Sequence, residues 1–211
     1  MEVAVSYLKS KYDTKTTLKL IENTSANYIH VDLMDGGFVP RRNFEVDDVI
    51  KLLSGTNKDL DIHLMAFDPI IYVEELAKLK PTYITFHVEA THDIVNTIER
   101  IKWNNIKVGL SIKPNTDILE LMPYLSLVDL VLIMSVNPGL GGQEFMVDTV
   151  NRVNNLIKIR EENKLNFKIE VDGGINEDTI KNVLGVDMVV SGSYVCMSDN
   201  FEDAVNKLRL N

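Results

Sequence analysis

The sequence predicts an α/β protein whose fold is a (β/α)8 TIM barrel. Short runs rich in Val and Ile alternate with longer stretches of helical periodicity, and this alternation is typical of a parallel sheet covered by helices. The alternation repeats eight times over 211 residues, which is the number of units in a closed barrel. Each unit averages about 26 residues, so the connecting loops are short.

Each predicted strand is a short apolar run with many β-branched residues. Parallel strands are covered on both faces, so they form nearly continuous apolar runs in the sequence. In chain order the predicted strands are 3–8, 28–34, 59–65, 82–88, 106–112, 127–134, 167–171 and 186–191.

A stretch with apolar residues at helical spacing follows each strand. In chain order the predicted helices are 15–23, 46–53, 70–79, 93–104, 118–125, 147–163, 178–183 and 201–208. No linker or change of composition divides the chain, so we expect one domain over residues 1–211. An open doubly wound sheet that binds a dinucleotide would have a glycine-rich turn after its first strand, and residues 8–12 contain no glycine.

Composition and charge exclude several classes of protein. Apolar residues make up 45% of the chain and charged residues 25%, which is ordinary for a globular domain. The net charge of −9 repels nucleic acid and anionic lipid, so neither is an expected partner. A small phosphorylated substrate remains compatible, because backbone N–H groups can bind phosphate. The single cysteine, Cys196, and the absence of a signal-type apolar run predict a cytoplasmic protein.

Ionisable side chains end three of the predicted strands, where barrels carry their chemistry. His30 and Asp32 end the second strand, His63 the third and Asp172 the seventh. A single histidine at a strand end is more often structural, but burying several ionisable groups without a partner is costly. Two imidazoles and two carboxylates therefore predict one divalent metal ion, namely zinc, iron, manganese or cobalt.

Other strand ends allow two interpretations. His87 is either a further polar group of the site or a core histidine, whereas His92 is expected in solvent. Methionines end three strands and either fill gaps in the core or line the site with polarisable sulfur atoms. These three are Met34, Met65 and Met134.

Glycines follow the last three strands, where this fold usually binds phosphate. Glycine lets the backbone approach a phosphate closely. One glycine pair would indicate only a turn, whereas three such places favour a phosphate site. The residues concerned are Gly139, Leu140, Gly141 and Gly142, then Gly173 and Gly174, then Gly192 and Ser193.

Two carboxylates across a metal ion can exchange protons with opposite faces of one carbon. Asp32 and Asp172 are therefore predicted to invert a centre next to a carbonyl through an enediolate, one removing the proton and the other returning it. A Schiff-base aldolase would need a lysine inside the barrel. No predicted strand end supplies one, and Lys113 is the nearest candidate.

Five segments resemble the ribulose-phosphate 3-epimerase family. They are HVDLMDGGFVP at 30–40, DIHLM at 61–65, TFHVEA at 85–90, VNPGLGGQEF at 136–145 and VDGGIN at 171–176. Their order over nearly the whole chain makes the set more specific than any single segment. The resemblance implies a ribulose-phosphate-binding barrel that interconverts D-ribulose 5-phosphate and D-xylulose 5-phosphate with one divalent metal ion.

By position, the resemblance implies that His30, Asp32, His63 and Asp172 are metal ligands and that the two aspartates are the acid/base pair. It implies that Ser6, His63, Asp172 and the glycine segments named above contact the substrate. This chain departs from the family's usual residues at Val5, Lys9, Gly37 and Arg41 and around 184–186.

Two alternatives remain open. One is an epimerase of a related ketose phosphate such as allulose 6-phosphate, although Asn137, Gly142 and Gly174 favour the pentose. The other is a non-catalytic phosphosugar-binding barrel, which would not need two opposed carboxylates. We also expect a homo-oligomer, although composition does not distinguish apolar helix faces inside the barrel from those between subunits.

Overall fold

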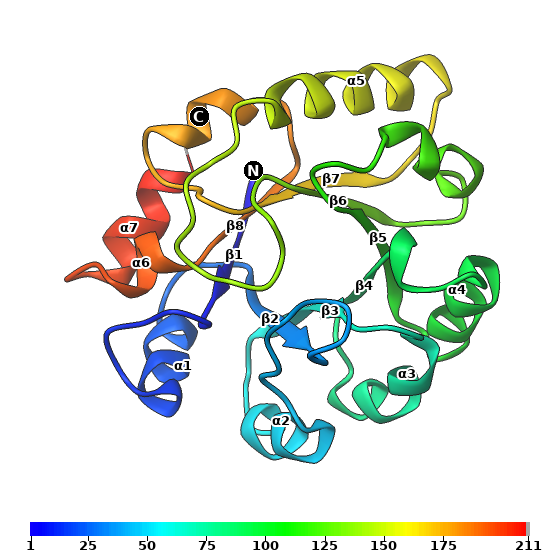
Figure 1. Ribbon diagram of the computed structural model, residues 1–211. Coiled ribbons are helices and arrows are strands. Elements are labelled where there is room, and N and C mark those ends of the chain that lie inside the picture. Colours follow the sequence, from blue (N-terminus) through cyan, green and yellow to red (C-terminus); the bar gives the residue numbers. More distant parts are fainter. Residues whose placement is uncertain (210–211) are drawn as a thin grey trace.

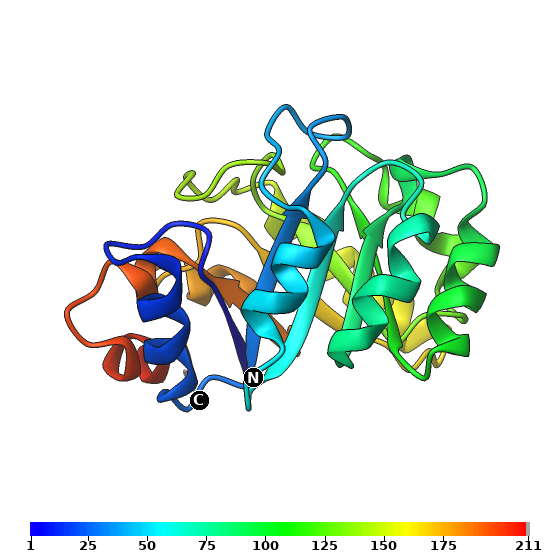
Figure 2. The ribbon, with the colours of Figure 1, turned by 90° about the horizontal axis from the view of Figure 1, so that it is seen from below.

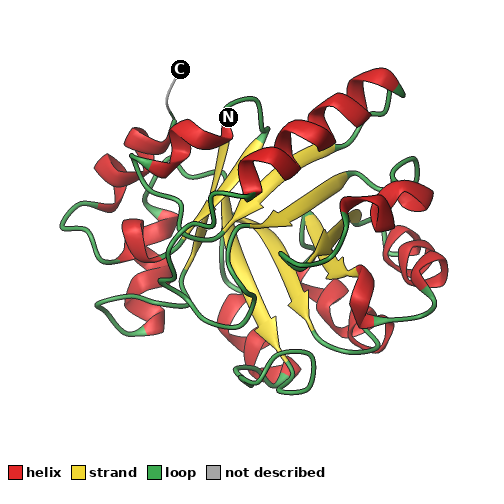
Figure 3. Cartoon of the chain, turned by 45° about the horizontal axis from the view of Figure 1, so that its top comes forward, coloured by secondary structure: helices red, strands yellow, loops and turns green. Residues whose placement is uncertain are grey.

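The computed structural model describes residues 1–209, and the last two residues of the predicted domain lie outside this part. Within it, eight parallel strands form a closed barrel in which each strand pairs with the next and β8 pairs with β1. Helices surround this barrel, as Figure 1 shows in a view close to the barrel axis and Figure 3 shows by type of element. The TIM-barrel prediction is confirmed.

The strands begin and end close to their predicted positions. They are β1 (Glu2–Ser6), β2 (Tyr28–Met34), β3 (Asp59–Met65), β4 (Tyr83–His87), β5 (Lys107–Ile112), β6 (Leu130–Met134), β7 (Lys168–Asp172) and β8 (Met188–Ser191).

The connections between strands contain α-helices and short 3-10 helices. The α-helices are α1 (Thr14–Glu22), α2 (Val46–Leu53), α3 (Ile70–Leu76), α4 (Ile94–Trp103), α5 (Thr149–Glu162), α6 (Ser193–Cys196) and α7 (Phe201–Leu208). The 3-10 helices are η1 (Ala77–Leu79), η2 (Val88–Ala90), η3 (Ile118–Tyr124) and η4 (Thr179–Val183).

Three predictions about the elements were wrong in detail. The first strand ends at Ser6 rather than at residue 8, so the chain leaves the barrel earlier than its apolar pattern indicates. The stretches predicted as helices at 118–125 and 178–183 are 3-10 helices. Pro123 lies inside η3, and a proline lacks the N–H that an α-helix would use. The four-residue α6 was not predicted, because it is too short to show a period.

Side chains alternate between two apolar layers along each strand. Val31 and Leu33 belong to the large layer between strands and helices, whereas Leu132 and Val190 belong to a smaller cluster inside the barrel. On β2 the inward positions are taken by His30 and Asp32 rather than by apolar residues. The interior is therefore apolar in part and ionisable near the carboxyl ends of β2, β3 and β7.

The loops that follow the strands gather at one end of the barrel. In Figure 2 the loop after β2 and the loop after β6 project at the same end, and the N-terminus lies at the opposite end. Within residues 1–209, no helix is long and apolar enough to cross a membrane.

Candidate active site

The pairing of β2 with β3 sets histidines beside aspartates. In this register His30 lies beside Asp61, and Asp32 lies beside His63. Because residues two apart on a strand share a face, all four side chains point into the barrel as two adjacent His–Asp pairs. One register thus fixes most of the site, and a shift of β3 by one residue would turn Asp61 and His63 toward the helices.

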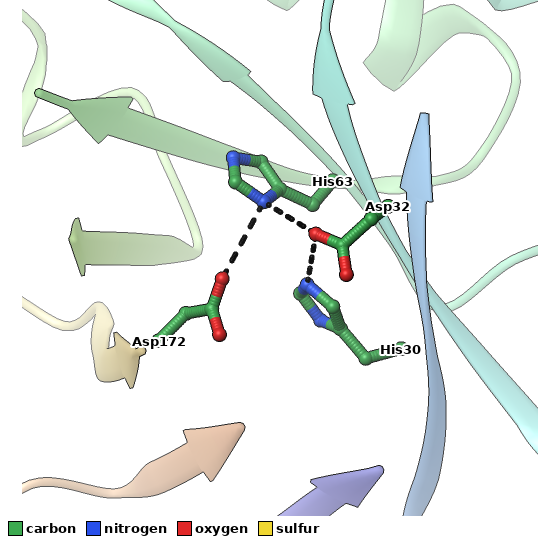
Figure 4. A group of neighbouring side chains, drawn as sticks. All are labelled: His30, Asp32, His63 and Asp172. Atoms are coloured by element: carbon green, nitrogen blue, oxygen red, sulfur yellow. Dashed lines mark hydrogen bonds and ion pairs between the residues drawn. The ribbon is translucent and has the colours of Figure 1, made fainter. Parts of the chain in front are cut away.

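Asp172 at the end of β7 completes a cluster with His30, Asp32 and His63. His63 Nδ1 lies 3.3 Å from Asp32 Oδ1 and 3.8 Å from Asp172 Oδ2, and His30 Nε2 lies 3.4 Å from Asp32 Oδ1. Figure 4 shows Asp32 and Asp172 approaching His63 from opposite sides. The four residues predicted from the strand ends therefore meet at one point.

This cluster could hold a metal ion. One nitrogen or oxygen atom from each of the four residues lies within 4.8 Å of the others. His30 Nε2 faces the cluster, and it is buried without a hydrogen-bond partner among the described residues. An unpartnered buried nitrogen is costly, and coordination would satisfy it. Two imidazoles and two carboxylates suit a divalent transition metal.

Carboxylates deeper in the barrel fix which nitrogen of His30 faces the cluster. His30 Nδ1 lies 2.5 Å from Asp61 Oδ2, and both side chains are fully buried. When Nδ1–H donates to this carboxylate, Nε2 keeps a free lone pair for a metal. Burial lowers the pKa of His30, but Asp61 and Asp32 outweigh burial and raise it overall.

His63 is oriented by His87, whose role was open. The two Nε2 atoms are 2.8 Å apart, and His87 Nδ1 lies 3.4 Å from Glu89 Oε2. Burial is the largest cause that lowers the pKa of His87 to about 4, so this ring is neutral at pH 7. His63 Nε2–H can then donate to His87, which leaves His63 Nδ1 facing the cluster as a free acceptor. His87 is thus a polar group of the site.

The pKa values of Asp32 and Asp172 are shifted in opposite directions. Burial raises the pKa of Asp172, and the nearby Asp32 carboxylate raises it further, to about 6. Burial also opposes ionisation of Asp32, but His30 and His63 outweigh it and lower the pKa of Asp32 below its usual range. Such a difference within a pair of carboxyl groups is typical of an acid and a base.

Asp61 and Glu170, which are fully buried, and Glu89, which is partly buried, belong to this network and were not predicted from the sequence. Asp61 and Glu170 lie two residues before His63 and Asp172, so strand alternation places them on the same inward faces. Neither residue stands at a strand end, because both lie one layer deeper in the barrel. Burial and the neighbouring Asp61 raise the pKa of Glu170 well above its usual range.

A cavity opens above the cluster at the barrel mouth, and nearly all predicted substrate-contacting residues line it. Ser6 lines it and donates a hydrogen bond of 2.7 Å from its hydroxyl to Asp32 Oδ2. His63 is the exception, because it is fully buried with His30. The predicted residues on the lining are Ser6, Asp32, Met34, Met65, Met134, Gly139, Leu140, Gly141, Gly142, Asp172, Gly173, Gly174, Gly192 and Ser193.

The loops after β6 and β7 approach each other so closely that glycine is required. Gly174 has φ +64°, and a Cβ there would lie 2.5 Å from the backbone nitrogen of Phe145.

Lys113, the candidate aldolase lysine, is not on the cavity lining; its ammonium lies 3.7 Å from the centre of the Phe38 ring. Among the family departures, Gly37 and Arg41 are exposed in the loop after β2.

Comparisons with known proteins identify the family of this chain. Residues 2–196 match the Ribulose-phosphate 3 epimerase family. Ribulose-phosphate 3-epimerase of Treponema pallidum is 37% identical over 83% of this chain and 82% of its own length. The protein of the same name from Mycobacterium tuberculosis is 39% identical over 87% and 81%, and that from Bacillus subtilis is 32% identical over 99% and 98%.

Solved structures with much lower identity share the fold. KGPDC from Streptococcus mutans matches with a TM-score of 0.69 and 16% identity over 99% of this chain and 95% of its own. The 3-hexulose-6-phosphate synthase from Salmonella typhimurium matches with a TM-score of 0.70 and 15% identity over 99% and 96%. At this identity the likeness concerns the barrel alone. The sequence matches decide the family: the chain belongs to the Ribulose-phosphate 3 epimerase family.

Proposed function

We propose that the protein is a ribulose-phosphate 3-epimerase, which interconverts D-ribulose 5-phosphate and D-xylulose 5-phosphate. The observation that carries this proposal is the pair Asp32 and Asp172, which reach one metal-competent cluster from opposite sides of the barrel mouth. An epimerase that removes a proton from one face of a carbon and returns one to the other face needs such a pair. The family membership supports the same activity.

The proposed proton transfers follow from the lowered pKa of Asp32 and the raised pKa of Asp172. Ionised Asp32 removes the proton from C3 of one epimer, and the C3–H electrons move toward the C2 carbonyl to give an enediolate. Protonated Asp172 then donates its proton to the opposite face of C3, and the two roles exchange in the reverse direction. The Ser6 hydroxyl and the two histidines hold Asp32 in place. A divalent cation bound by the four residues would stabilise negative charge on the sugar oxygens.

We propose that the phosphate group lies among the loops after β6, β7 and β8. Gly142, Gly174 and Ser193 line the same cavity as the aspartates, so a phosphate there and C3 at the cluster would belong to one substrate. Met34, Met65 and Met134 line the same cavity as the aspartates, and their apolar side chains would exclude water from the enediolate.

Substitution of each aspartate tests the two-base mechanism. We expect Asp32→Asn and Asp172→Asn each to lower kcat by about 10³-fold or more, whereas Asp178→Asn on the surface leaves it unchanged. In D2O the wild type incorporates deuterium at C3 of both epimers. Each variant keeps the base on one face only, so it exchanges C3 of at most one epimer. Wild-type turnover in Asp172→Asn would contradict the proposal.

The same assay distinguishes the alternatives. Faster turnover of allulose 6-phosphate than of ribulose 5-phosphate would identify the related six-carbon epimerase. Tight binding of both phosphates without turnover or exchange in the metal-loaded protein would identify a binding barrel. The expected homo-oligomer stays a prediction, which sedimentation of the purified protein tests.

A further inference from the structure

Lys9 brings a positive charge to the cavity on the side where the glycine loops lie. It follows β1 by three residues, in the loop to α1. Its ammonium packs against Gly142, which has φ +79°, so closely that any Cβ on Gly142 would overlap it. A Cβ on Gly141 would lie 3.2 Å from Lys9 Cβ. The loop after β6 therefore leaves space for the Lys9 side chain because positions 141 and 142 are glycines.

Lys9 also shares a cavity lining with the loops after β7 and β8. It lines the cavity together with Gly174, Gly192 and Ser193, and it lines the adjoining groove with Gly174 and Ser193. Within residues 1–209 it is the one lysine or arginine on the cavity lining. Lys9 thus borders the cavity that the three glycine segments line, with its ammonium beside Gly142.

Among residues 1–209, no carboxylate oxygen lies within 4.0 Å of the Lys9 ammonium. Nine other lysines of the described chain pair with carboxylates within 4.0 Å or donate to backbone carbonyls, but no such contact occurs at Lys9 Nζ. Lys9 is exposed, so its positive charge is available to an anion that enters the cavity. In a protein of net charge −9, such a cation makes the electrostatic potential at the cavity more favourable for an anion.

We propose that Lys9 is a phosphate-binding residue of this chain, whose ammonium donates a charge-assisted hydrogen bond to the phosphate of the sugar. This inference rests on the proposed function, because it places the phosphate among the glycine loops. Backbone N–H groups supply only partial charges there, whereas an ammonium carries a full one. Lys9 is one of the positions at which this chain departs from the family's usual residues, so the contact would be a feature of this chain.

Calorimetric titration with inorganic phosphate tests the inference without turnover. We expect Lys9→Ser and Lys9→Met to weaken phosphate binding about tenfold and Lys9→Arg to stay near the wild type. The methionine keeps the length of the stem, so it separates charge from packing against Gly142. Lys15→Ser removes the same charge from the exposed start of α1 and serves as the matched control.

The ionic-strength dependence of phosphate binding and the KM for ribulose 5-phosphate give two further tests. Phosphate binding by the wild type should weaken more between low and high ionic strength than binding by Lys9→Met, because one ion pair is screened. The KM for ribulose 5-phosphate should rise about tenfold in Lys9→Met, whereas the binding of unphosphorylated ribulose should not change.

The outcomes separate this inference from the proposed function. Wild-type phosphate affinity in Lys9→Met, or an equal loss in Lys15→Ser, overturns the role of Lys9 even if the protein is an epimerase. Conversely, phosphate binding that depends on Lys9 in a protein without epimerase turnover keeps the inference and overturns the activity.

Discussion

At the scale of single residues, the site depends on which nitrogen of each histidine faces the cluster. His30 presents Nε2 because Asp61 holds Nδ1, and His63 presents Nδ1 because His87 holds Nε2. A histidine ring that can flip or change tautomer spends part of its time without a free lone pair toward the metal. Asp61 and His87, which do not themselves face the cluster, would therefore set how well His30 and His63 hold a metal ion.

Asp61 is accordingly expected to control metal affinity without touching the metal. Asp61→Asn keeps the size of the side chain but removes the charge that orients His30, and we expect the affinity for Co²⁺ or Zn²⁺ to fall about 10–100-fold. Competition with a chelator measures this directly, and the absorption spectrum of bound Co²⁺ reports any change of geometry.

Thr85→Val is the matched control for this prediction. Thr85 is equally buried and pairs in register with His63, but its hydroxyl has no partner among residues 1–209. We expect Thr85→Val to keep wild-type metal affinity. Equal affinities in Asp61→Asn and Thr85→Val would contradict the positioning role of Asp61.

At the scale of elements, Asp35 organises the loop after β2. One of its oxygens accepts hydrogen bonds of 2.8 Å from the backbone N–H groups of Gly37 and Phe38, and the other accepts one of 2.9 Å from Phe67. The last bond joins this loop to the loop after β3. Burial opposes ionisation of Asp35, but these three N–H groups outweigh it and lower its pKa.

We expect Asp35→Ala to lower the free energy of unfolding by about 2 kcal/mol, as measured by denaturation at pH 7. Asp35→Asn keeps one acceptor oxygen and should lose mainly the bond to Phe67, visible as faster hydrogen exchange at that amide. Because the folded pKa is lowered, this stabilisation is complete above the usual carboxyl pKa and disappears as the pH falls through the folded value. A difference between Asp35→Ala and wild type that grows on acidification would contradict this account.

The sequence predicts the elements and the cluster for one physical reason. Alternation along strands and the meeting of strand ends in a barrel are geometric, so His30, Asp32, His63 and Asp172 could be placed together from their spacing. Helix type was less predictable, because it depends on local hydrogen bonds such as the one that Pro123 cannot donate in η3. Lys9 could be recognised as unusual, but its proximity to Gly142 depends on how two distant loops approach each other.

At the scale of the whole molecule, the net charge of −9 includes acids that face inward. Asp32, Asp61, Glu170 and Asp172 lie inside the barrel, and two histidines do not balance them. A bound divalent cation would offset this excess and connect β2, β3 and β7 across the barrel. Metal binding should therefore stabilise the whole fold as well as the reaction.

We expect the melting temperature to rise with metal concentration. A metal at 100 times its Kd adds about 2.7 kcal/mol to the free energy of unfolding, which in a chain of this size is a rise of roughly 5–10 °C. His30→Gln should lose most of this rise, whereas His92→Gln should keep it, because His92 is exposed in a loop. The measured quantity is the difference between metal-loaded and chelated protein, so a lower starting stability of His30→Gln does not affect the comparison. The same metal-dependent rise in both variants would mean that the cation binds outside the cluster.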